Sequence, residues 1–460
     1  MLDGKQTRPR GPSISFPLVL MAQLFPRRFP FDPLAFSVSL AREYGDIAFF
    51  RLGPMSVYQL NHPDLVRQIL VEQANKYYKP RLLKLAARRI LGKGLLTSDG
   101  GQWRQQRKLI QPAFRHDRLS AYSDVMVAHA LRTAEGFGDE EVRDIGAEMG
   151  KLTLAVVVKS LFGGDLPLEA ADLGETLLAI ADAANQRMSS PLQLPSWAPT
   201  RKNRREKRAL TRLNAVLRLL IQTRRASVEC RDDLLSVLLA AADDESHAGM
   251  SDRQLRDEMM TLFLAGQETT ANALTWTWYL LARHPRVETR LWEELDRVLA
   301  GRLPAAADLP DLPFTEMVIR EAMRLYPPAP AFAREPIEDV VLGGYRVAKG
   351  SLITISTYAL HRDPRFFPDP ERFDPDRFAP GWEESIPRYA YLPFGGGPRV
   401  CIGNGFAMME ARLLLATIAQ RCRLSLEPMA EVAPQQLVTL RPNGSVRMKV
   451  QKRATELAAG

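Results

Sequence analysis

The most informative segment of the chain is the run Phe394-Gly395-Gly396-Gly397-Pro398-Arg399-Val400-Cys401-Ile402-Gly403. Its glycines let the backbone approach something flat and bulky, because no side chain stands between. A helical pattern follows, so Cys401 lies at the entrance to a helix, where free N–H groups and the helix dipole favour a thiolate that can bind a metal. Taken alone, a cysteine beside glycines is more often structural. The run also lacks the Lys-Ser/Thr end of a phosphate-binding loop.

The composition is that of a globular protein. Of 460 residues, 46% are hydrophobic and 25% are charged, which excludes disordered, collagen-like and repeat proteins. The three cysteines, Cys230, Cys401 and Cys422, cannot build a disulfide scaffold and are typical of a reducing compartment. The apolar stretch from Ser13 to Phe25 is shorter than the ~20 residues of a membrane-spanning helix, and no secretion signal is recognisable. We therefore expect a cytoplasmic protein without a membrane span.

The net charge of +9 is compatible with nucleic acid, an acidic membrane surface or an acidic protein partner. The densest basic cluster runs from Arg201 to Arg208 and continues into an amphipathic segment that ends near Arg224. It contains no interleaved aromatic residues that could stack on bases. We interpret the cluster as the solvated face of a helix and expect no binding of nucleic acid.

The pattern of apolar residues predicts a mainly α protein with a minor β region. Short runs from Asp46 to Leu60, broken at Gly53 and Pro54, predict a strand pair, and helical spacing prevails from about residue 63 to residue 299. Further helices are expected over residues 312–325 and 403–421, and strands over residues 340–347, 352–358 and 424–450. The irregular stretch 362–391 is long for a compact fold, and such loops tend to be functional.

One helix is predicted to be unusually long. Ser251 and Gln254 form a capping start, and the helical pattern stops at His284 before a proline, so about 32 residues would span about 48 Å. Its middle reads Ala265-Gly266-Gln267-Glu268-Thr269-Thr270, whose glycine and hydroxyl residues weaken a helix. Either a close helix–helix contact at Ala265-Gly266 or a bound ligand must offset that cost.

Taken together, these segments resemble the cytochrome P450 family over about residues 45–450. The family's haem-binding pattern, Phe-x-x-Gly-x-Arg-x-Cys-x-Gly, is matched at Phe394, Gly397, Arg399, Cys401 and Gly403. The middle of the long helix matches the family's oxygen-binding groove, Ala/Gly-Gly-x-Asp/Glu-Thr. The resemblance implies the cytochrome P450 fold, with haem between the long central helix and the cysteine loop. It also implies one catalytic domain over residues 1–460, with no fused reductase domain.

The resemblance assigns roles to individual residues. Cys401 would bind the iron of haem b, while Glu268 and Thr269 fall on the family's catalytic acid–alcohol pair, in which the hydroxyl and an ordered water hold dioxygen and the carboxylate passes protons. Guanidinium groups match the carboxylates of haem. The further haem-binding residues implied are Trp103, Arg107, Arg334, Arg399, Phe394, Gly403 and Ala265, with His361 as a weaker candidate.

The resemblance to the family implies a structural role for a third motif. Glu321 and Arg324 lie three residues apart on the predicted helix 312–325, a spacing that ordinarily gives a weak surface ion pair. Here the pair matches the family's Glu-x-x-Arg, and Pro370-Glu371-Arg372-Phe373 matches the segment that supplies a second arginine. The resemblance therefore implies that Glu321, Arg324 and Arg372 lock the core on the cysteine side without a catalytic role.

The implied reaction is monooxygenation, in which one oxygen atom of O2 enters a lipophilic small molecule such as a fatty acid, terpenoid, steroid or drug-like compound. The substrate-contact regions of the family fall on residues that are largely apolar. They are Leu262, Ala265, Ala329, Phe332, Leu440 and parts of the segment from Leu82 to Leu96.

Electrons from NAD(P)H would reach the haem through a separate ferredoxin or flavodoxin with its reductase. A basic docking patch for this partner is expected at Arg104, Arg107, Lys108, Arg115 and Arg118, and the protein is expected to be a monomer. Three alternatives stay open. They are a peroxide-driven peroxygenase that would not need Glu268 and Thr269, a non-catalytic haem-binding sensor, and a haem-free basic scaffold that binds nucleic acid.

Overall fold

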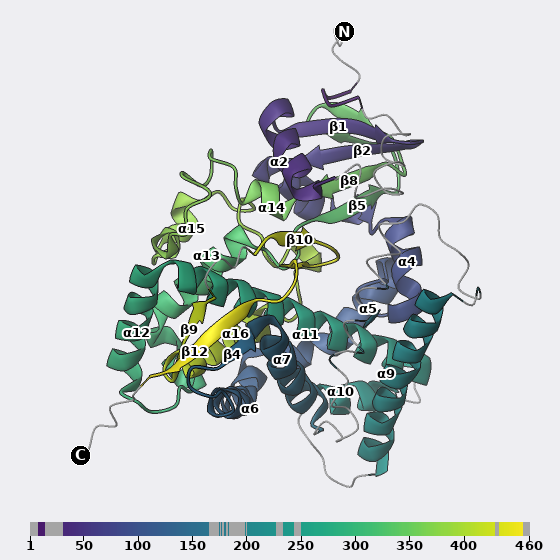
Figure 1. The fold of residues 1–460 in the computed structure, drawn as a ribbon. Helices are drawn as coiled ribbons and strands as arrows, with labels where there is room; N and C mark the ends of the chain where they lie inside the picture. The colour runs from purple at the N-terminus through teal and green to yellow at the C-terminus, as the bar shows by residue number, and fades with distance from the viewer. Residues whose placement is uncertain are drawn as a thin grey trace.

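The computed structural model describes residues 8–13, 31–164, 200–226, 233–242, 250–427 and 432–453, together with single positions between 174 and 198. Residues 14–25 of the apolar amino-terminal stretch and Cys230 lie outside this part of the chain. The described residues are mostly helical with small β-sheets, which confirms the predicted fold class. In Figure 1, helix α11 (Asp252–Arg283) passes through the middle of the molecule, with a sheet region above it and most other helices around and below it.

The helices begin and end close to the predicted breaks. They are α2 (Pro33–Tyr44), α3 (Pro63–Arg67), α4 (Arg81–Leu91), α5 (Gly100–Ile110), α6 (His116–Glu135), α7 (Ile145–Phe162), α9 (Arg201–Ala226), α10 (Leu234–Ala242), α11, α12 (Pro285–Leu299), α13 (Pro313–Leu325), α14 (Thr357–Leu360), α15 (Trp382–Ser385) and α16 (Asn404–Ala419). Prolines occupy the first turn of α2, α3, α12 and α13, where the missing N–H is not needed.

Helix α11 has the predicted start and length. The Ser251 side chain accepts a hydrogen bond from the Gln254 N–H at 3.3 Å, and the helix extends over 32 residues. It packs on α7, α13 and α16. A Cβ atom added at Gly266 would lie 3.1 Å from Cγ2 of Val157 on α7, so the close helix–helix contact does occur at this glycine. The neighbouring Ala265, in contrast, is exposed.

The amino-terminal strand pair is confirmed as β1 (Ile47–Leu52) and β2 (Met55–Leu60), which pair in an antiparallel hairpin. The hairpin belongs to a sheet of order β1-β2-β8-β5-β3, in which β8 (Leu352–Ile355), β5 (Phe332–Pro336) and β3 (Tyr77–Tyr78) complete the set. The strand predicted over 352–358 ends early because Ser356 caps α14 and accepts from the Ala359 N–H. Residues 340–347 form the predicted strands as the hairpin β6 (Val340–Leu342) and β7 (Tyr345–Val347).

The carboxyl-terminal strands are also confirmed. Strand β12 (Arg447–Lys452) pairs with β9 (Cys422–Leu426) and with β4 (Val142–Asp144), a short strand that the sequence did not predict. A separate hairpin consists of β10 (Pro434–Gln436) and β11 (Leu440–Pro442). The Trp276 Nε1 donates to the Leu440 carbonyl at 3.2 Å, so this hairpin lies against the carboxyl-terminal half of α11.

Two hydrophobic cores meet near the cysteine loop. The larger core joins the helices, and the smaller one lies under the sheet around Tyr58, Leu60 and Ile353. Leu392 belongs to the smaller core, whereas Phe394, two residues further, packs against the larger one. The backbone that leads to Cys401 is therefore held from both sides.

Candidate functional site

Cys401 lies between a short 3-10 turn, η7 (Gly397–Arg399), and the start of α16. Its N–H donates to the Phe394 carbonyl at 2.9 Å. The side chain reaches open space although protein surrounds it on most sides. Burial raises the pKa of the Cys401 thiol, against the opposing effects of the Gly403 N–H and the Arg107 guanidinium. The environment within the chain therefore does not favour the expected thiolate, whereas a bound cation would lower the pKa of this thiol.

The glycine run serves the protein's own packing. Gly397 has a φ of +65°, and a Cβ atom there would lie 1.9 Å from the carbonyl oxygen of Leu70 in the π-helical turn η1 (Gln68–Glu72). Gly395 also has a positive φ, +71°. The sequence analysis attributed these glycines to the approach of a flat ligand, but at Gly397 the close neighbour is backbone. The result is a loop clamped to η1 with little freedom to move.

The middle of α11 opens on one side. Ala265 is exposed and Thr269 is half-buried, whereas the turns before and after them are largely buried. The Thr269 hydroxyl donates to the Ala265 carbonyl at 2.7 Å. Glu268 takes another direction, since its Oε1 accepts from the Thr439 hydroxyl at 2.5 Å. The alcohol and the acid are adjacent in sequence but have different hydrogen-bond partners.

A cluster of cations surrounds one carboxylate near the loop. Asp99 accepts from Arg399 at 2.5 Å and pairs with Lys84 at 2.7 Å. Lys79 interacts electrostatically with these three residues and with Arg334. Burial, reinforced by Arg399 and Arg334, lowers the pKa of Lys79 to about 7, and burial likewise lowers the pKa of Arg334 to about 10. Four basic side chains thus share a single acid, which leaves the cluster short of negative charge.

Trp103 and Arg107 connect this cluster to the cysteine loop. The Arg399 guanidinium lies 4.3 Å from the centre of the Trp103 ring, and that of Arg107 lies 5.8 Å from it. Arg107 Nη1 donates to the carbonyl of Val400, next to Cys401, at 2.9 Å. The structure therefore brings together the predicted residues Trp103, Arg107, Arg334 and Arg399.

The roles of Lys79, Lys84 and Asp99 in this cluster could not be predicted from the sequence. No local pattern marks Lys79 as part of a site. It reaches Arg334 because strands β3 and β5 pair, with Tyr77 opposite Pro336. This contact joins segments more than 250 residues apart, so only a prediction of strand pairing could have found it.

The assignment of His361 to the haem-anchoring set is wrong. Its Nε2 accepts from the Leu392 N–H at 3.0 Å, and its carbonyl accepts from Arg324 at 2.9 Å. Complete burial lowers the pKa of His361 to about 3, so it is a neutral residue of the core. It belongs with Glu321 and Arg324, which are fully buried and joined at 2.6 Å.

The assignment of Arg372 as the side chain that completes this structural group is also wrong. The Arg372 side chain is 69% exposed, and only its carbonyl takes part, by accepting from Arg324 at 3.0 Å. Arg377 instead approaches Glu321, with Nε 3.5 Å from Oε1, and is 12% exposed. The chain contains two Arg-Phe pairs five residues apart, and the turn η6 (Pro375–Phe378) directs the second arginine inwards.

The residues implied as substrate contacts lie in three different environments. Leu440 lies beside the segment that contains Ala329 and Phe332, because its N–H donates to the Pro328 carbonyl at 3.0 Å. Leu262 is buried in the larger core. In the segment from Leu82 to Leu96, three apolar side chains are exposed, namely Leu82, Leu85 and Leu96.

These features fit haem. Among the described residues, no three His, Cys, Asp or Glu side chains gather in a way that could hold a metal ion. Haem brings four nitrogen ligands of its own and needs one further sulfur, which Cys401 offers in an open position. The propionates of haem would supply the negative charge that the cluster around Asp99 lacks.

Comparisons with known proteins agree. A model of the family described as "Cytochrome P450" matches residues 9–449. Cyclooctatin synthase of Streptomyces melanosporofaciens is 43% identical over 418 residues, which cover 90% of each chain. The chain belongs to the cytochrome P450 family. Pentalenene oxygenase of Streptomyces avermitilis is 37% identical over 422 residues, covering 92% of this chain and 93% of the relative.

A further relative is cyclooctat-9-en-7-ol 5-monooxygenase of Streptomyces melanosporofaciens, 39% identical over 399 residues, or 85% of each chain. Membership of the cytochrome P450 family, together with relatives named as oxygenases, confirms that the protein is a haem-dependent monooxygenase. In the described part of this P450, no helix is long and apolar enough to cross a membrane.

Proposed function

We propose that this P450 inserts oxygen into a cyclic terpenoid or a lipophilic molecule of similar shape. In the overall reaction, substrate, O2, two electrons and two protons give the hydroxylated product and water. The observation that carries the proposal is the similarity, over most of the chain, to relatives whose names specify pentalenene and cyclooctat-9-en-7-ol as the compounds oxygenated. Fatty acids, steroids and drug-like compounds are the other classes that an apolar site of this family accepts.

Several residues are suited to hold the haem. Cys401 would bind the iron, and Lys79, Arg334, Arg399, Arg107 and Trp103 would bind the propionates. The bound haem supplies the chemistry, namely activation of O2 for attack on unactivated C–H bonds. The close approach of Gly397 to the Leu70 backbone would help to hold the loop that carries the sulfur.

Two residues of α11 would transfer protons during the reaction. The Thr269 hydroxyl now donates to the Ala265 carbonyl and can turn to donate into the open side of the helix instead. The Glu268 carboxylate, one residue before it, can take up protons from water and pass them on. A peroxide-driven reaction would need neither residue, and for this reason the proposal favours O2 with external electrons.

The exposed leucines support a lipophilic substrate. Leu82, Leu85 and Leu96 are 67%, 71% and 49% exposed, which is unusual for leucine. They lie on and after α4, a helix whose charged residues Arg81 and Arg88 are also exposed. We include them in the proposed route by which an apolar molecule enters.

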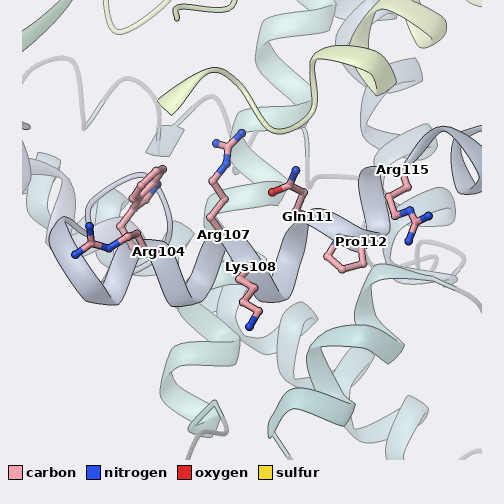
Figure 2. A pocket seen from close by; sticks show the side chains of 7 residues that line it. Arg104, Arg107, Lys108, Gln111, Pro112 and Arg115 are labelled. Carbon is pink, nitrogen blue, oxygen red and sulfur yellow. The ribbon is translucent and has the colours of Figure 1, made fainter. Parts of the chain in front are cut away.

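The electron donor is proposed to be an acidic ferredoxin or flavodoxin, supplied by its reductase from NAD(P)H. A hollow of about 480 Å³ is lined by Trp103, Arg104, Arg107, Lys108, Gln111, Pro112 and Arg115. Figure 2 shows Arg107 and Gln111 on one side of the α5 segment and Lys108 on the other, with Arg115 further along the chain. Arg118 lies outside this lining, so the proposed docking patch comprises Arg104, Arg107, Lys108 and Arg115.

The proposed function includes the oligomeric state, the domain organisation and the location of the protein. We take the chain to be a monomer with one catalytic domain that acts in the cytoplasm. The scarcity of cysteine supports a reducing compartment.

The proposal is tested with a panel of ligands and a turnover assay. Cyclic terpenes, fatty acids and steroids are added to the ferric holoprotein, and the low-to-high spin shift is recorded. Terpenes should give the tightest binding and, with ferredoxin, reductase and NADPH, a hydroxylated product. A shift with long-chain acids alone would overturn the substrate class, and equal turnover with peroxide alone would favour a peroxygenase.

A further inference from the structure

Three residues on one face of α11 bond to two consecutive residues of the β10–β11 hairpin. Glu268, Asn272 and Trp276 follow one another at intervals of four, so they lie along one stripe of the helix. Glu268 Oε1 accepts from the Thr439 hydroxyl at 2.5 Å, and Asn272 Nδ2 donates to the same hydroxyl at 3.3 Å. Trp276 Nε1 donates to the Leu440 carbonyl at 3.2 Å.

These hydrogen bonds have a fixed direction. A threonine hydroxyl has one proton to give and can accept as well. At Thr439 the oxygen accepts from the Asn272 amide, and the proton goes to the carboxylate of Glu268. Thr439 is 7% exposed and Asn272 is 8% exposed, so water competes little for either group. The chain Asn272–Thr439–Glu268 therefore fixes one orientation of the carboxylate.

The hairpin itself is firmly placed. The Leu437 N–H donates to the Thr439 carbonyl at 2.9 Å, and the Leu440 N–H donates to the Pro328 carbonyl at 3.0 Å. Leu440 is fully buried. Contacts within the hairpin, with α11 and with the segment after α13 therefore hold Thr439 in place. Its hydroxyl can in turn orient the Glu268 carboxylate.

Thr269 does not share this arrangement. Successive residues of a helix point about 100° apart, and the Thr269 hydroxyl is bonded to the Ala265 carbonyl on the open side of α11. A proton that leaves Glu268 must therefore pass to another side of the helix to reach Thr269, so the place where the carboxylate is held determines its path. A carboxylate free to rotate would spend most of its time elsewhere.

We propose that Thr439 is a positioning residue for proton delivery, which acts by holding the Glu268 carboxylate against the β10–β11 hairpin, where the acid takes up protons that are passed on towards Thr269. The inference rests on the proposed function and adds the residue that controls its acid. Since Leu440 adjoins Thr439, the same hairpin that borders the proposed substrate site also sets the proton donor. Without the hydrogen bond between Thr439 and Glu268, more of the electrons from NADPH would form hydrogen peroxide and fewer would form product.

The test compares Thr439→Val, which keeps the shape and removes the hydroxyl, with Thr439→Ser, which keeps the hydroxyl. Product and hydrogen peroxide formed per NADPH are measured in the holoenzyme with its electron donor. Thr439→Val should lower product per NADPH by at least about tenfold, the loss expected when one hydrogen bond to a charged group is removed. Thr439→Ser should restore most of it, and Asn272→Leu should give a smaller loss.

A matched control is available on the same helix. Thr277 is fully buried and its hydroxyl donates to the Ala273 carbonyl at 2.7 Å, so Thr277→Val removes the same group away from the site. This variant should retain the coupling of the parent. All variants are first compared by thermal unfolding and by the carbon monoxide spectrum, so that a failure to fold is not mistaken for uncoupling.

A double-mutant cycle shows whether Thr439 acts through Glu268. Glu268→Gln alone should uncouple the enzyme and change the solvent kinetic isotope effect, and adding Thr439→Val should cause no further change. Additive effects, or a Thr439→Val enzyme with parental coupling and isotope effect, would overturn the inference. An absence of NADPH consumption and product in the parent enzyme would instead refute the proposed function itself.

Discussion

The core around Glu321 and Arg324 and the cluster around Asp99 both place charged side chains inside the protein, but they differ in balance. The Arg324 guanidinium meets both oxygens of Glu321 at 2.6 and 2.7 Å and donates to the carbonyls of His361, Pro370 and Arg372. Around Asp99, four cations share one carboxylate. In the first group, the chain itself supplies the partners of the buried charges. In the second group, positive charge exceeds negative charge.

This difference separates a structural site from a binding site. A buried ion pair with all its hydrogen bonds made has no need of a ligand, and its loss is felt by the fold. A cluster with excess charge gains stability when an oppositely charged ligand arrives. The propionates of haem meet that need, so the contrast predicts which variants unfold the protein and which release its cofactor.

The largest effect is expected from Arg324→Ala. Removal of the guanidinium leaves the Glu321 carboxylate buried without its partner and should cost about 3–5 kcal/mol of the free energy of unfolding. Chemical denaturation of the haem-free protein measures this loss. A change below about 1 kcal/mol would show that the pair is not the structural element described here.

The two arginines near this core provide a matched pair of controls. Arg377→Ala removes a side chain that is 12% exposed and lies 3.5 Å from Glu321, so it should destabilise the protein by about 1–2 kcal/mol. Arg372→Ala removes a side chain that is 69% exposed and should change stability by less than about 0.5 kcal/mol. The reverse order would restore the assignment made from the sequence.

Arg334→Leu is expected to act on the haem instead of the fold. One charge-assisted hydrogen bond is worth about 1.5–3 kcal/mol, which corresponds to at least about tenfold faster loss of haem. The stability of the haem-free protein should stay the same or rise, because a buried cation in an overcharged cluster is removed. Transfer of haem to apomyoglobin measures the rate, and an unchanged rate with a destabilised apoprotein would place Arg334 in the structural group.

The pH dependence of stability should report Lys79. Its pKa is lowered from 10.5 to about 7 in the folded chain. Between these values the unfolded chain binds a proton that the folded chain lacks, so the haem-free protein should become more stable as the pH rises from about 7 towards 10.5. Lys79→Met should flatten this rise, and bound haem should flatten it too by keeping the lysine charged. Identical pH profiles for parent and variant would refute the assignment.

The smallest effect is expected at the exposed cations. Arg104→Glu and Lys108→Glu should slow reduction by ferredoxin severalfold at low salt, with little change in the spin shift caused by substrate. The difference should fade at high salt because exposed charges are screened. Arg208→Glu on α9, also exposed, is the control and should leave the rate unchanged. Equal effects of all three would indicate a general influence of net charge.

The same contrast explains what could be predicted from the sequence. Cys401, the long helix and the pair Glu321–Arg324 are encoded within short segments, so spacing and capping residues revealed them. Lys79 and Thr439 acquire their neighbours only through β3–β5 pairing and the β10–β11 hairpin, which join distant segments. Arg372 was chosen over Arg377 because two similar pairs occur close together, and only the fold shows which one turns inwards.

Binding of haem iron by the Cys401 sulfur can be seen in the spectrum of the reduced protein under carbon monoxide. We expect a strongly red-shifted Soret band in the parent and in Cys422→Ala, whose cysteine is buried elsewhere. Cys401→Ala should lose this band. Its absence from the parent, or its persistence in Cys401→Ala, would contradict the account.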